Sequence, residues 1–512
     1  MMTTQTDLRY LDVTCAALDA AVDEAARKLA PACLAAVVDR GSIVAARAWG
    51  QPRLDGTPTL PWAVFRIASM TKSFLAATVL ALRDEGRLDL HRPITEYVPD
   101  VVLTYDGELV DVTLSQLLSN SGGLPEDNAW ADRHLDLSVA ELGAIASAGL
   151  RLTRRPGTAY QYSNLGQSLV GRAIEAVTGQ PVEQVIRERL LEPLGLVNTW
   201  FHATDYPEWT DVAWGFRTFD QGASFVREPY VGSGAMACTG GLFSTVDDIA
   251  AWMWFLGSAF TDRPVDPDVL APASRREMQV GRTPIPIGGD PADARLDARG
   301  YGYGLKVELD RRFGRIVSHA GGLPGFNSDM RWHAATGLGV VLFANADGFN
   351  KSQRLSEKVL YDVLKGIDAP AEAVRPWPET LRAAQAVDEA IRADAPLASL
   401  GDLLSPNLLA DAPDDVRRAR TQALLAQTGS MLSDPAPFED RVVAAADPAA
   451  LRWRIDCWGG ALICDIRLMA LADPVVQTVT VSLADPYGRK PHDEARMVTD
   501  HTFVLTGPPG HH

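Results

Sequence analysis

Ser69 and Lys72 stand three residues apart inside the apolar stretch FRIASMTKSFLAATVLAL. A serine hydroxyl is a poor nucleophile until a neighbouring group takes its proton, and an i, i+3 spacing on a helix places the lysine side chain beside it. To serve as the base the lysine must be neutral, which burial favours by lowering its pKa. The pair predicts a serine nucleophile with a lysine activator; a helix-capping serine with a surface lysine is the competing interpretation.

Lysine is scarce in this chain. Its 512 residues include 24 serines and only seven lysines, although Lys and Arg together number 48. Such counts predict roughly a third of one Ser-x-x-Lys sequence by accident. Since the pattern occurs once, in a lysine-poor and apolar stretch, the scarcity favours a functional pair.

Two further patterns carry groups that such a serine would need. Tyr162-Ser163-Asn164 follows about 90 residues later. Its phenol, beside a cationic lysine, can act as a phenolate base or as a proton relay, and an Asn side chain can bind a substrate carbonyl. Ser318-His319-Ala320-Gly321-Gly322 ends a β-like run, where the imidazole can titrate near neutral pH and the glycines let a ligand approach backbone N–H groups. Taken alone, each is better explained as a packed tyrosine or as a hairpin turn with an incidental histidine.

The hydrophobic pattern predicts the elements that position these residues. Helices are expected over 7–29, from Met70 to Glu85 with Gly86 as its C-cap, over 165–194, after Ser244 and over 352–365. Strands are expected over 34–38 and 42–50, joined by the three-residue connection Asp39-Arg40-Gly41, and over 301–309, 314–321, 326–334 and 337–347. The Pro/Asp/Arg-rich segment 261–300 is interpreted as a surface excursion.

This order of elements predicts an α+β fold. Strands at both ends with helices between them imply an antiparallel sheet flanked by helices, with a helical region inserted. The Pro-rich stretch 369–380 is the most linker-like segment, and helices at 380–393 and 414–427 before strand pairs around Gly459-Gly460 predict a small C-terminal α+β domain. The predicted boundaries are 1–368 for the first domain, 369–380 for the linker and 381–512 for the accessory domain.

Composition and charge exclude several function classes. The 65 acidic and 48 basic residues give a net charge of −17 and a pI near 5.0, which argues against binding to nucleic acid or to an anionic membrane surface. No apolar run reaches the length of a membrane span, and the N-terminus lacks the pattern of a signal peptide. Five scattered cysteines predict neither a disulfide framework nor a zinc site. A cytoplasmic protein without metal or cofactor is expected.

The joint pattern resembles the serine β-lactamase and penicillin-binding-protein superfamily, in its class C and DD-peptidase-like esterase branch. Besides the motifs Ser-x-x-Lys, Tyr-x-Asn and His-x-Gly, four further stretches resemble the sequences of this family: LLSNSGGLP (117–125), residues 156–199, GGLFSTVDD (240–248) and HAGGLPGF (319–326). The resemblance covers about residues 10–366. It implies an antiparallel sheet with an all-helical lobe and a site between them.

Carried over residue by residue, the resemblance implies Ser69 as the acylated nucleophile, Lys72 as its activator and Tyr162 as general base or acid. It implies Asn164, Gly321 and Gly322 as substrate contacts, His319 as the third-motif residue, and the backbone N–H groups of Ser69 and Gly322 as the oxyanion hole. Many β-lactamases have lysine in place of His319, and the deacylating carboxylate of class A enzymes has no counterpart here. Efficient penicillin hydrolysis is therefore disfavoured.

Three functions remain open. The leading hypothesis is a serine hydrolase that forms an acyl-enzyme from a small ester, amide or D-amino-acid-containing peptide and releases it to water. The alternative is an acyltransferase or thioesterase-like peptide cyclase that passes the acyl group to an amine or alcohol. A catalytically inactive binding protein is the third. The expected partner is a small-molecule substrate, and the sequence leaves the oligomeric state open.

Overall fold

The computed structural model describes residues 5–288, 294–347, 349, 352–369, 373–374, 376–484, 494–498 and 502–506. The chain forms two compact units, one of Met1–Asp310 with Arg315–Ala369 and the other of Arg311–Gly314 with Pro370–His512. No helix within the described ranges is long and apolar enough to cross a membrane.

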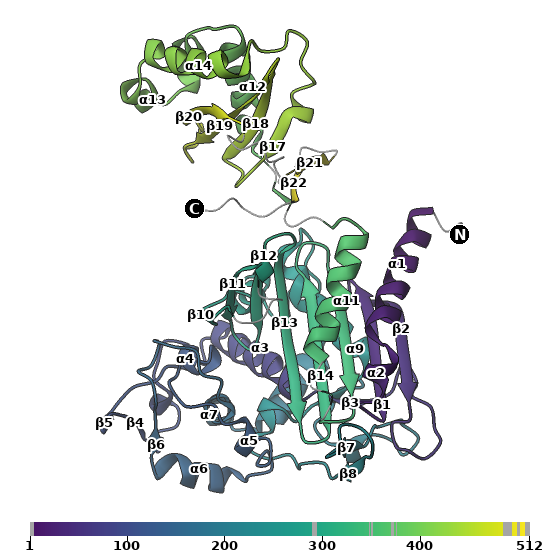
Figure 1. Ribbon diagram of the computed structural model, residues 1–512. Helices are drawn as coiled ribbons and strands as arrows, with labels where there is room; N and C mark the ends of the chain where they lie inside the picture. The colour runs from purple at the N-terminus through teal and green to yellow at the C-terminus, as the bar shows by residue number, and fades with distance from the viewer. Residues whose placement is uncertain are drawn as a thin grey trace. The chain divides into compact units, whose positions relative to one another are not determined.

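An eight-stranded sheet is the centre of the first unit (Figure 1), in the order β10-β11-β12-β13-β14-β15-β1-β2. Its strands are β1 (Ala32–Asp39), β2 (Ser42–Gly50), β10 (Thr283–Pro284), β11 (Leu296–Tyr301), β12 (Lys306–Asp310), β13 (Gly314–Leu323), β14 (Phe326–His333) and β15 (Leu338–Ala344). Antiparallel pairing of β1 with β15 joins the first part of the unit to the last. The predicted antiparallel sheet, assembled from both ends of this unit, is confirmed.

The hairpin between β1 and β2 is tighter than the three-residue connection expected from the sequence. Asp39 pairs with Ser42, so only Arg40 and Gly41 form the turn, with φ of 47° and 82°. Two residues at positive φ match the right-handed twist of the flanking strands. β1 itself is buried along nearly its whole length, as its continuous apolar run predicts for a central strand.

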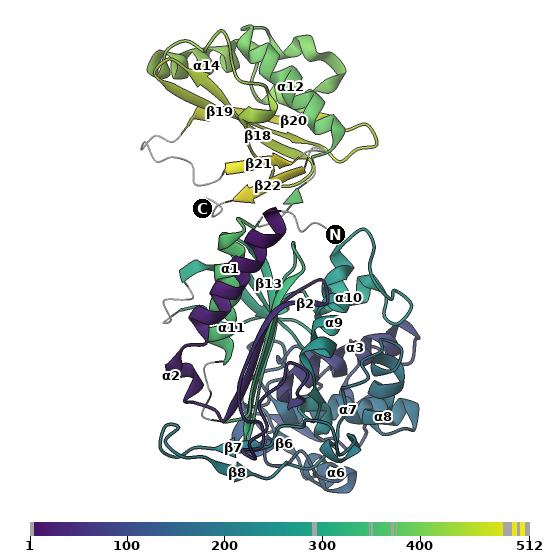
Figure 2. The ribbon, with the colours of Figure 1, turned by 90° about the vertical axis from the view of Figure 1, so that its right-hand side faces the viewer.

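Helices cover both faces of this sheet. Figure 2 shows α1 (Gln5–Ala21) and α11 (Ser352–Gly366) on one face and α9 (Val246–Gly257) and α3 (Thr71–Asp84) on the other. Trp252 and Phe255 of α9 belong to the core, where Trp252 stacks on Phe74 of α3 at 4.0 Å between ring centroids. The predicted helix over 7–29 is shorter than expected, because Asp23 caps a separate helix, α2 (Glu24–Arg27), by accepting from the backbone N–H of Ala26.

The inserted region is mainly helical, as predicted. It also contains short strands, so the lobe is not all-helical as the family resemblance implied. Its helices are α4 (Leu114–Leu118), α5 (Asn128–Ala131), α6 (Val139–Ser147), α7 (Asn164–Thr178) and α8 (Val182–Ile186), and its three-stranded sheet consists of β4 (Leu103–Tyr105), β5 (Glu108–Leu109) and β6 (Leu150–Arg151). Two-stranded pairs are formed by β3 (Phe65–Arg66) with β9 (Phe243–Ser244) and by β7 (Gly215–Arg217) with β8 (Val226–Glu228).

Segment 261–300 contributes to the core and is more than the surface excursion expected. It contains α10 (Pro272–Met278), β10 and most of β11, and both Arg275 and Met278 are fully buried. The single strand predicted over 301–309 is a hairpin instead, because Tyr301 pairs with Lys306 across a turn. That turn ends β11 at Tyr301, a residue with a role in the site.

The second unit is an α+β domain, as expected. Its four-stranded sheet, β17-β18-β19-β20, packs with α12 and α14 around a core that contains Trp453. Its elements are β16 (Ala373–Val374), α12 (Pro378–Arg392), α13 (Pro406–Asp411), α14 (Asp414–Thr428), β17 (Val442–Ala444), β18 (Ala450–Cys457), β19 (Gly460–Leu468), β20 (Val476–Leu483), β21 (Glu494–Val498) and β22 (Thr502–Thr506). Of the predicted linker 369–380, residues 370–372 and 375 lie outside the described residues.

Candidate active site

Ser69 and Lys72 lie side by side at the start of α3. Lys72 is fully buried, and its Nζ donates to the Ser69 hydroxyl oxygen at 2.9 Å and to the Thr239 carbonyl at 2.7 Å. A short 3₁₀ turn, Ala68–Met70, precedes the helix and places Ser69 at its N-terminal end. Ala68 adopts φ of 49°, a left-handed conformation that costs an alanine about 1 kcal/mol and that surrounding contacts must maintain.

Burial is the main influence on the charge of Lys72. It lowers the pKa of the amine to about 7, although the nearby carboxylates of Asp132 and Asp127 act in the opposite direction. Asp132 is affected reciprocally: burial raises its pKa to about 6, and the charge of Lys72 opposes that rise. Near neutral pH a substantial share of Lys72 is therefore uncharged and has a lone pair to accept a proton.

Tyr162 completes the contacts of this pair. Its ring centroid lies 5.0 Å from Lys72 Nζ. Burial raises the pKa of the phenol well above its ordinary value, while a hydrogen bond with the Ser69 side chain lowers it in part. Tyr162 is therefore a protonated phenol at neutral pH, able to pass a proton but not poised as a phenolate.

Asp127 holds the start of α7 and was not among the residues found from sequence motifs. Its carboxylate accepts from the Ser163 hydroxyl at 2.8 Å and from the backbone N–H groups of Asn164 and Leu165 at 2.8 and 2.9 Å. Such a carboxylate satisfies free N–H groups at a helix N-terminus. The Asn164 amide, only 2% exposed, donates to Asp127 and to Asn128. Asn128 lines the cavity beside Ser69, and a substrate contact by Asn164 stays a prediction.

His319 lies on β13 with both ring nitrogens occupied. Its Nδ1 is 2.6 Å from the Ala320 carbonyl oxygen, and its Nε2 is 2.8 Å from the hydroxyl of Tyr301. Burial, together with the charge of Lys72, lowers the pKa of the imidazole to about 3. The expectation that this histidine titrates near neutral pH is wrong for this structure. Tyr301, the phenol that binds it, was missed because only an aromatic, glycine-rich turn marks it in the sequence.

A cavity of about 630 Å³ opens beside Ser69 and is lined by Ser69, Asp132, Tyr162, Tyr301, Lys306 and His319 among others. Gly321 and Gly322 also line it. Among the residues that the structure describes, no group of three or more His, Cys, Asp or Glu side chains could hold a metal ion. The arrangement offers a hydroxyl and a protonated phenol that line one cavity, with a partly neutral amine buried against the hydroxyl.

Gly321 allows β13 to pass against the backbone just before Ser69. A Cβ at Gly321 would lie 2.2 Å from the Ile67 carbonyl oxygen and 2.2 Å from Ser328 Oγ, the two atoms that hydrogen-bond each other at 2.7 Å. We expect Gly321→Ala to lower the free energy of unfolding by about 1–3 kcal/mol, because the Ile67 carbonyl oxygen cannot move without shifting the turn that carries Ser69. A Cβ at Gly322 would meet nothing within 4 Å, so Gly322→Ala is the matched control. Denaturant unfolding of both variants measures the difference; equal stability would contradict the close approach.

Comparisons with known proteins agree with this geometry. A family model described as Beta-lactamase matches residues 18–364. Protein flp of Staphylococcus aureus (strain MW2) is 26% identical over 315 residues, which are 60% of this chain and 58% of that protein. Unguisins hydrolase ungD' of Aspergillus campestris is 27% identical over 323 residues, 62% of this chain and 58% of that protein. The chain thus spans about 58% of the length of these two curated relatives.

Among solved structures, the D-amino acid amidase of Ochrobactrum anthropi SV3, in complex with L-phenylalanine amide, is 25% identical with a TM-score of 0.54. The match covers 69% of this chain and 98% of the amidase. The family model spans more than half of the chain and includes Ser69, Lys72, Tyr162 and His319. The chain belongs to the β-lactamase family, whose fold its first unit adopts.

Proposed function

We propose that the protein is a serine hydrolase that forms an acyl-enzyme at Ser69 and releases a small carboxylic acid from an ester, an amide or a D-amino-acid-containing peptide. The observation that carries this proposal is the 2.9 Å contact between Ser69 Oγ and the fully buried Nζ of Lys72. A buried amine with a lowered pKa is the group that a serine hydroxyl needs to lose its proton. The likeness to a D-amino acid amidase supports an amide of a D-amino acid as substrate.

In the proposed reaction neutral Lys72 takes the Ser69 proton as Oγ attacks the substrate carbonyl. The resulting oxyanion would be stabilised by the backbone N–H groups of Ser69 and Gly322. The carbon–nitrogen or carbon–oxygen bond then breaks, and the leaving group takes a proton from the Lys72 ammonium, directly or through Tyr162. Water adds to the acyl-enzyme in a second cycle of the same steps and releases the acid and free Ser69.

Intact-mass spectrometry tests this proposal. We would mix the full chain with D-phenylalanine amide, a D-phenylalanine p-nitroanilide, p-nitrophenyl esters and a penicillin, and quench after milliseconds to minutes. An added mass equal to the acyl group, mapped to Ser69, is the expected result. A folded protein with neither adduct nor turnover on the whole panel would overturn the proposal. Repeating the reaction with an added amine distinguishes hydrolysis from acyl transfer, because a dominant transfer product would favour the acyltransferase alternative.

The pH profile of kcat/KM reports the base. Because Lys72 must be neutral to accept the serine proton, kcat/KM should rise with pH through an inflection near its pKa of about 7 and then level off. His319, with a pKa of about 3, is already neutral over this range and adds no step. Initial rates on the D-phenylalanine p-nitroanilide between pH 5 and 9 measure the profile. A flat profile, or activity that falls through pH 7, would show that neutral Lys72 is not the base.

A further inference from the structure

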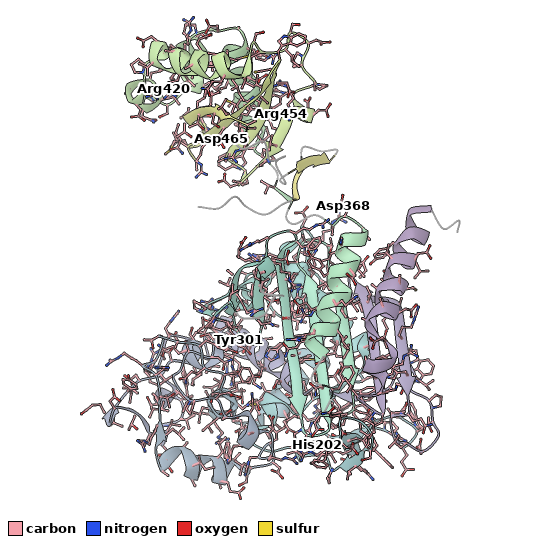
Figure 3. The ribbon with its side chains drawn as sticks, in the orientation of Figure 1. His202, Tyr301, Asp368, Arg420, Arg454 and Asp465 are labelled. Atoms are coloured by element: carbon pink, nitrogen blue, oxygen red, sulfur yellow. The ribbon has the colours of Figure 1, made fainter. Side chains whose placement is uncertain are left out.

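Tyr301 and His319 form a hydrogen-bonded pair inside the cavity of the candidate site. The Tyr301 hydroxyl lies 2.8 Å from His319 Nε2, and the two side chains belong to residues only 2% and 5% exposed. Figure 3 labels Tyr301 at the edge of the sheet of the first unit, next to the helical region. The pair stands on two different strands, β11 and β13, so the sheet itself sets its geometry.

The hydrogen bonds define the tautomer of His319. A backbone carbonyl oxygen only accepts hydrogen bonds, so Nδ1, at 2.6 Å from the Ala320 oxygen, must carry the proton. In the neutral ring Nε2 then has the lone pair, and the Tyr301 hydroxyl donates to it. Each imidazole nitrogen makes one hydrogen bond, and both partners are protein groups. No ring nitrogen remains to bind substrate or to exchange a proton with it.

The surroundings also disfavour a charged imidazole. His319 faces Lys72 from α3 and Lys306 from β12, and both cations act against a further positive charge. The phenols of Tyr162 and Tyr301 complete the enclosure, with ring centroids 6.3 and 5.8 Å from the imidazole. Both phenols have a pKa raised by burial, so neither supplies an anion to balance an imidazolium near neutral pH.

The turn that presents Tyr301 is packed against the helix that carries Lys72. Gly304, at φ 65°, lies so close that a Cβ there would be 2.4 Å from the Lys72 carbonyl oxygen. The rings of Tyr301 and Tyr162 meet edge to face, 6.2 Å apart. Tyr301 thus links His319 to the elements that hold Ser69, Lys72 and Tyr162.

We propose that Tyr301 is a positioning residue that holds His319 as the neutral Nδ1–H tautomer. In this state His319 forms part of the cavity wall beside Tyr162 and does not act as an acid or base. The inference rests on the proposed function for its effect on turnover. Proton transfers at the site then involve Lys72 and Tyr162, and the imidazole contributes an uncharged surface to the shape of the cavity. Loss of the Tyr301 hydroxyl would free Nε2 and let the ring take up a proton more easily.

The ring nitrogens of His319 can be followed by ¹H–¹⁵N NMR of the full chain labelled with ¹⁵N-histidine, between pH 4 and 8. His319→Gln identifies its signals. We expect the wild type to keep a neutral Nδ1–H pattern over the whole range. In Tyr301→Phe, proton affinity at His319 should rise at least about tenfold, equal to one pKa unit, so the Nδ1–H pattern should be lost towards pH 4, one unit above the wild-type pKa of about 3. An unchanged pattern in Tyr301→Phe, or an Nε2–H or charged ring in the wild type, would overturn the proposal.

Tyr303→Phe is the matched control. Tyr303 is fully buried two residues away in the same turn, and its hydroxyl bonds Ser115 at 2.7 Å, so the variant loses one buried hydroxyl without touching His319. We expect the His319 signals and the pH profile of Tyr303→Phe to match the wild type. Tyr301→Phe should lose about tenfold in kcat/KM.

The NMR readout needs no turnover, which separates the two proposals. If Ser69 is never acylated but the His319 pattern behaves as expected, only the proposed function fails. If the wild type is acylated at Ser69 and Tyr301→Phe leaves the imidazole unchanged, only the positioning role fails.

Discussion

Ser69→Ala should lower kcat/KM by about 10⁴-fold or more on every ester and amide substrate. The alanine has no oxygen to carry the acyl group, and loss of a nucleophile removes the covalent route altogether. The fold should persist, because Ser69 is one small side chain and Lys72 keeps its bond to the Thr239 carbonyl. Rates at pH 8 and intact mass after substrate addition measure the effect; an acyl adduct on the variant would place the nucleophile elsewhere.

Ser73→Ala is the control for that experiment. Ser73 is a fully buried serine on the same helix, and its Oγ donates to the Met70 carbonyl at 2.7 Å and accepts from Trp252 at 3.0 Å. Its removal costs about 1–3 kcal/mol of stability by leaving buried polar groups unpaired. We expect Ser73→Ala to keep activity within a few fold of the wild type while it unfolds earlier. Equal inactivation of both variants would point to damage of the helix rather than loss of a nucleophile.

Lys72→Met should lower kcat/KM about 10³- to 10⁴-fold without lowering thermal stability. Methionine is apolar and fills a similar volume but cannot accept the Ser69 proton. Burial holds the pKa of Lys72 below its unfolded value, so the unfolded chain binds more protons between pH 7 and about 10.5. The lysine therefore opposes folding most strongly below pH 7, and this penalty shrinks as the pH rises towards 10.5. Methionine removes that penalty, which offsets the two hydrogen bonds lost, at about 1 kcal/mol each.

Calorimetric melting curves at pH 7 and 9 check the stability side of this prediction. The advantage of Lys72→Met over the wild type should be larger at pH 7 than at pH 9. Lys306→Met provides the control for activity, because Lys306 is a lysine that lines the cavity and pairs with Glu308 at 3.4 Å. We expect that variant to lose less than about tenfold. If Lys72→Met kept more than a tenth of the wild-type rate, another group would have to be the base.

Local patterns were enough to predict the elements and the nucleophile pair. Ser69 and Lys72 are three residues apart on one helix, so backbone geometry alone brings them together, and the structure gives them a direct contact. Five strands of the main sheet, β1, β2, β13, β14 and β15, were predicted within a few residues, whereas β10 and most of β11 lie in the segment interpreted as a surface excursion. β1 and β15 are apolar runs buried along nearly their whole length. The β1–β2 turn and the division at Tyr301 were misjudged, since one residue of register decides which positions belong to a turn.

Residues that meet across the fold could not be found in the same way. Asp127 reaches Ser163 over 36 positions and Tyr301 reaches His319 over 18, and neither separation corresponds to a local repeat. The charge state of His319 also depends on burial and on Lys72, quantities that a single sequence does not contain. The resemblance to a family identified His319 as important, but it did not show which phenol binds it.

The sequence by itself determined the fold class, which follows from the order of elements, and the family resemblance, which rests on motifs spread over residues 10–366. It also determined the pairing of Ser69 with Lys72, because their spacing on one helix brings them together. Only the tertiary structure decided the electrostatics of the site. It buries Lys72 until its pKa is about 7, occupies both nitrogens of His319 and turns Asn164 towards Asp127. Desolvation and hydrogen bonding depend on what surrounds a group in space, and these surroundings come from segments far apart in the chain.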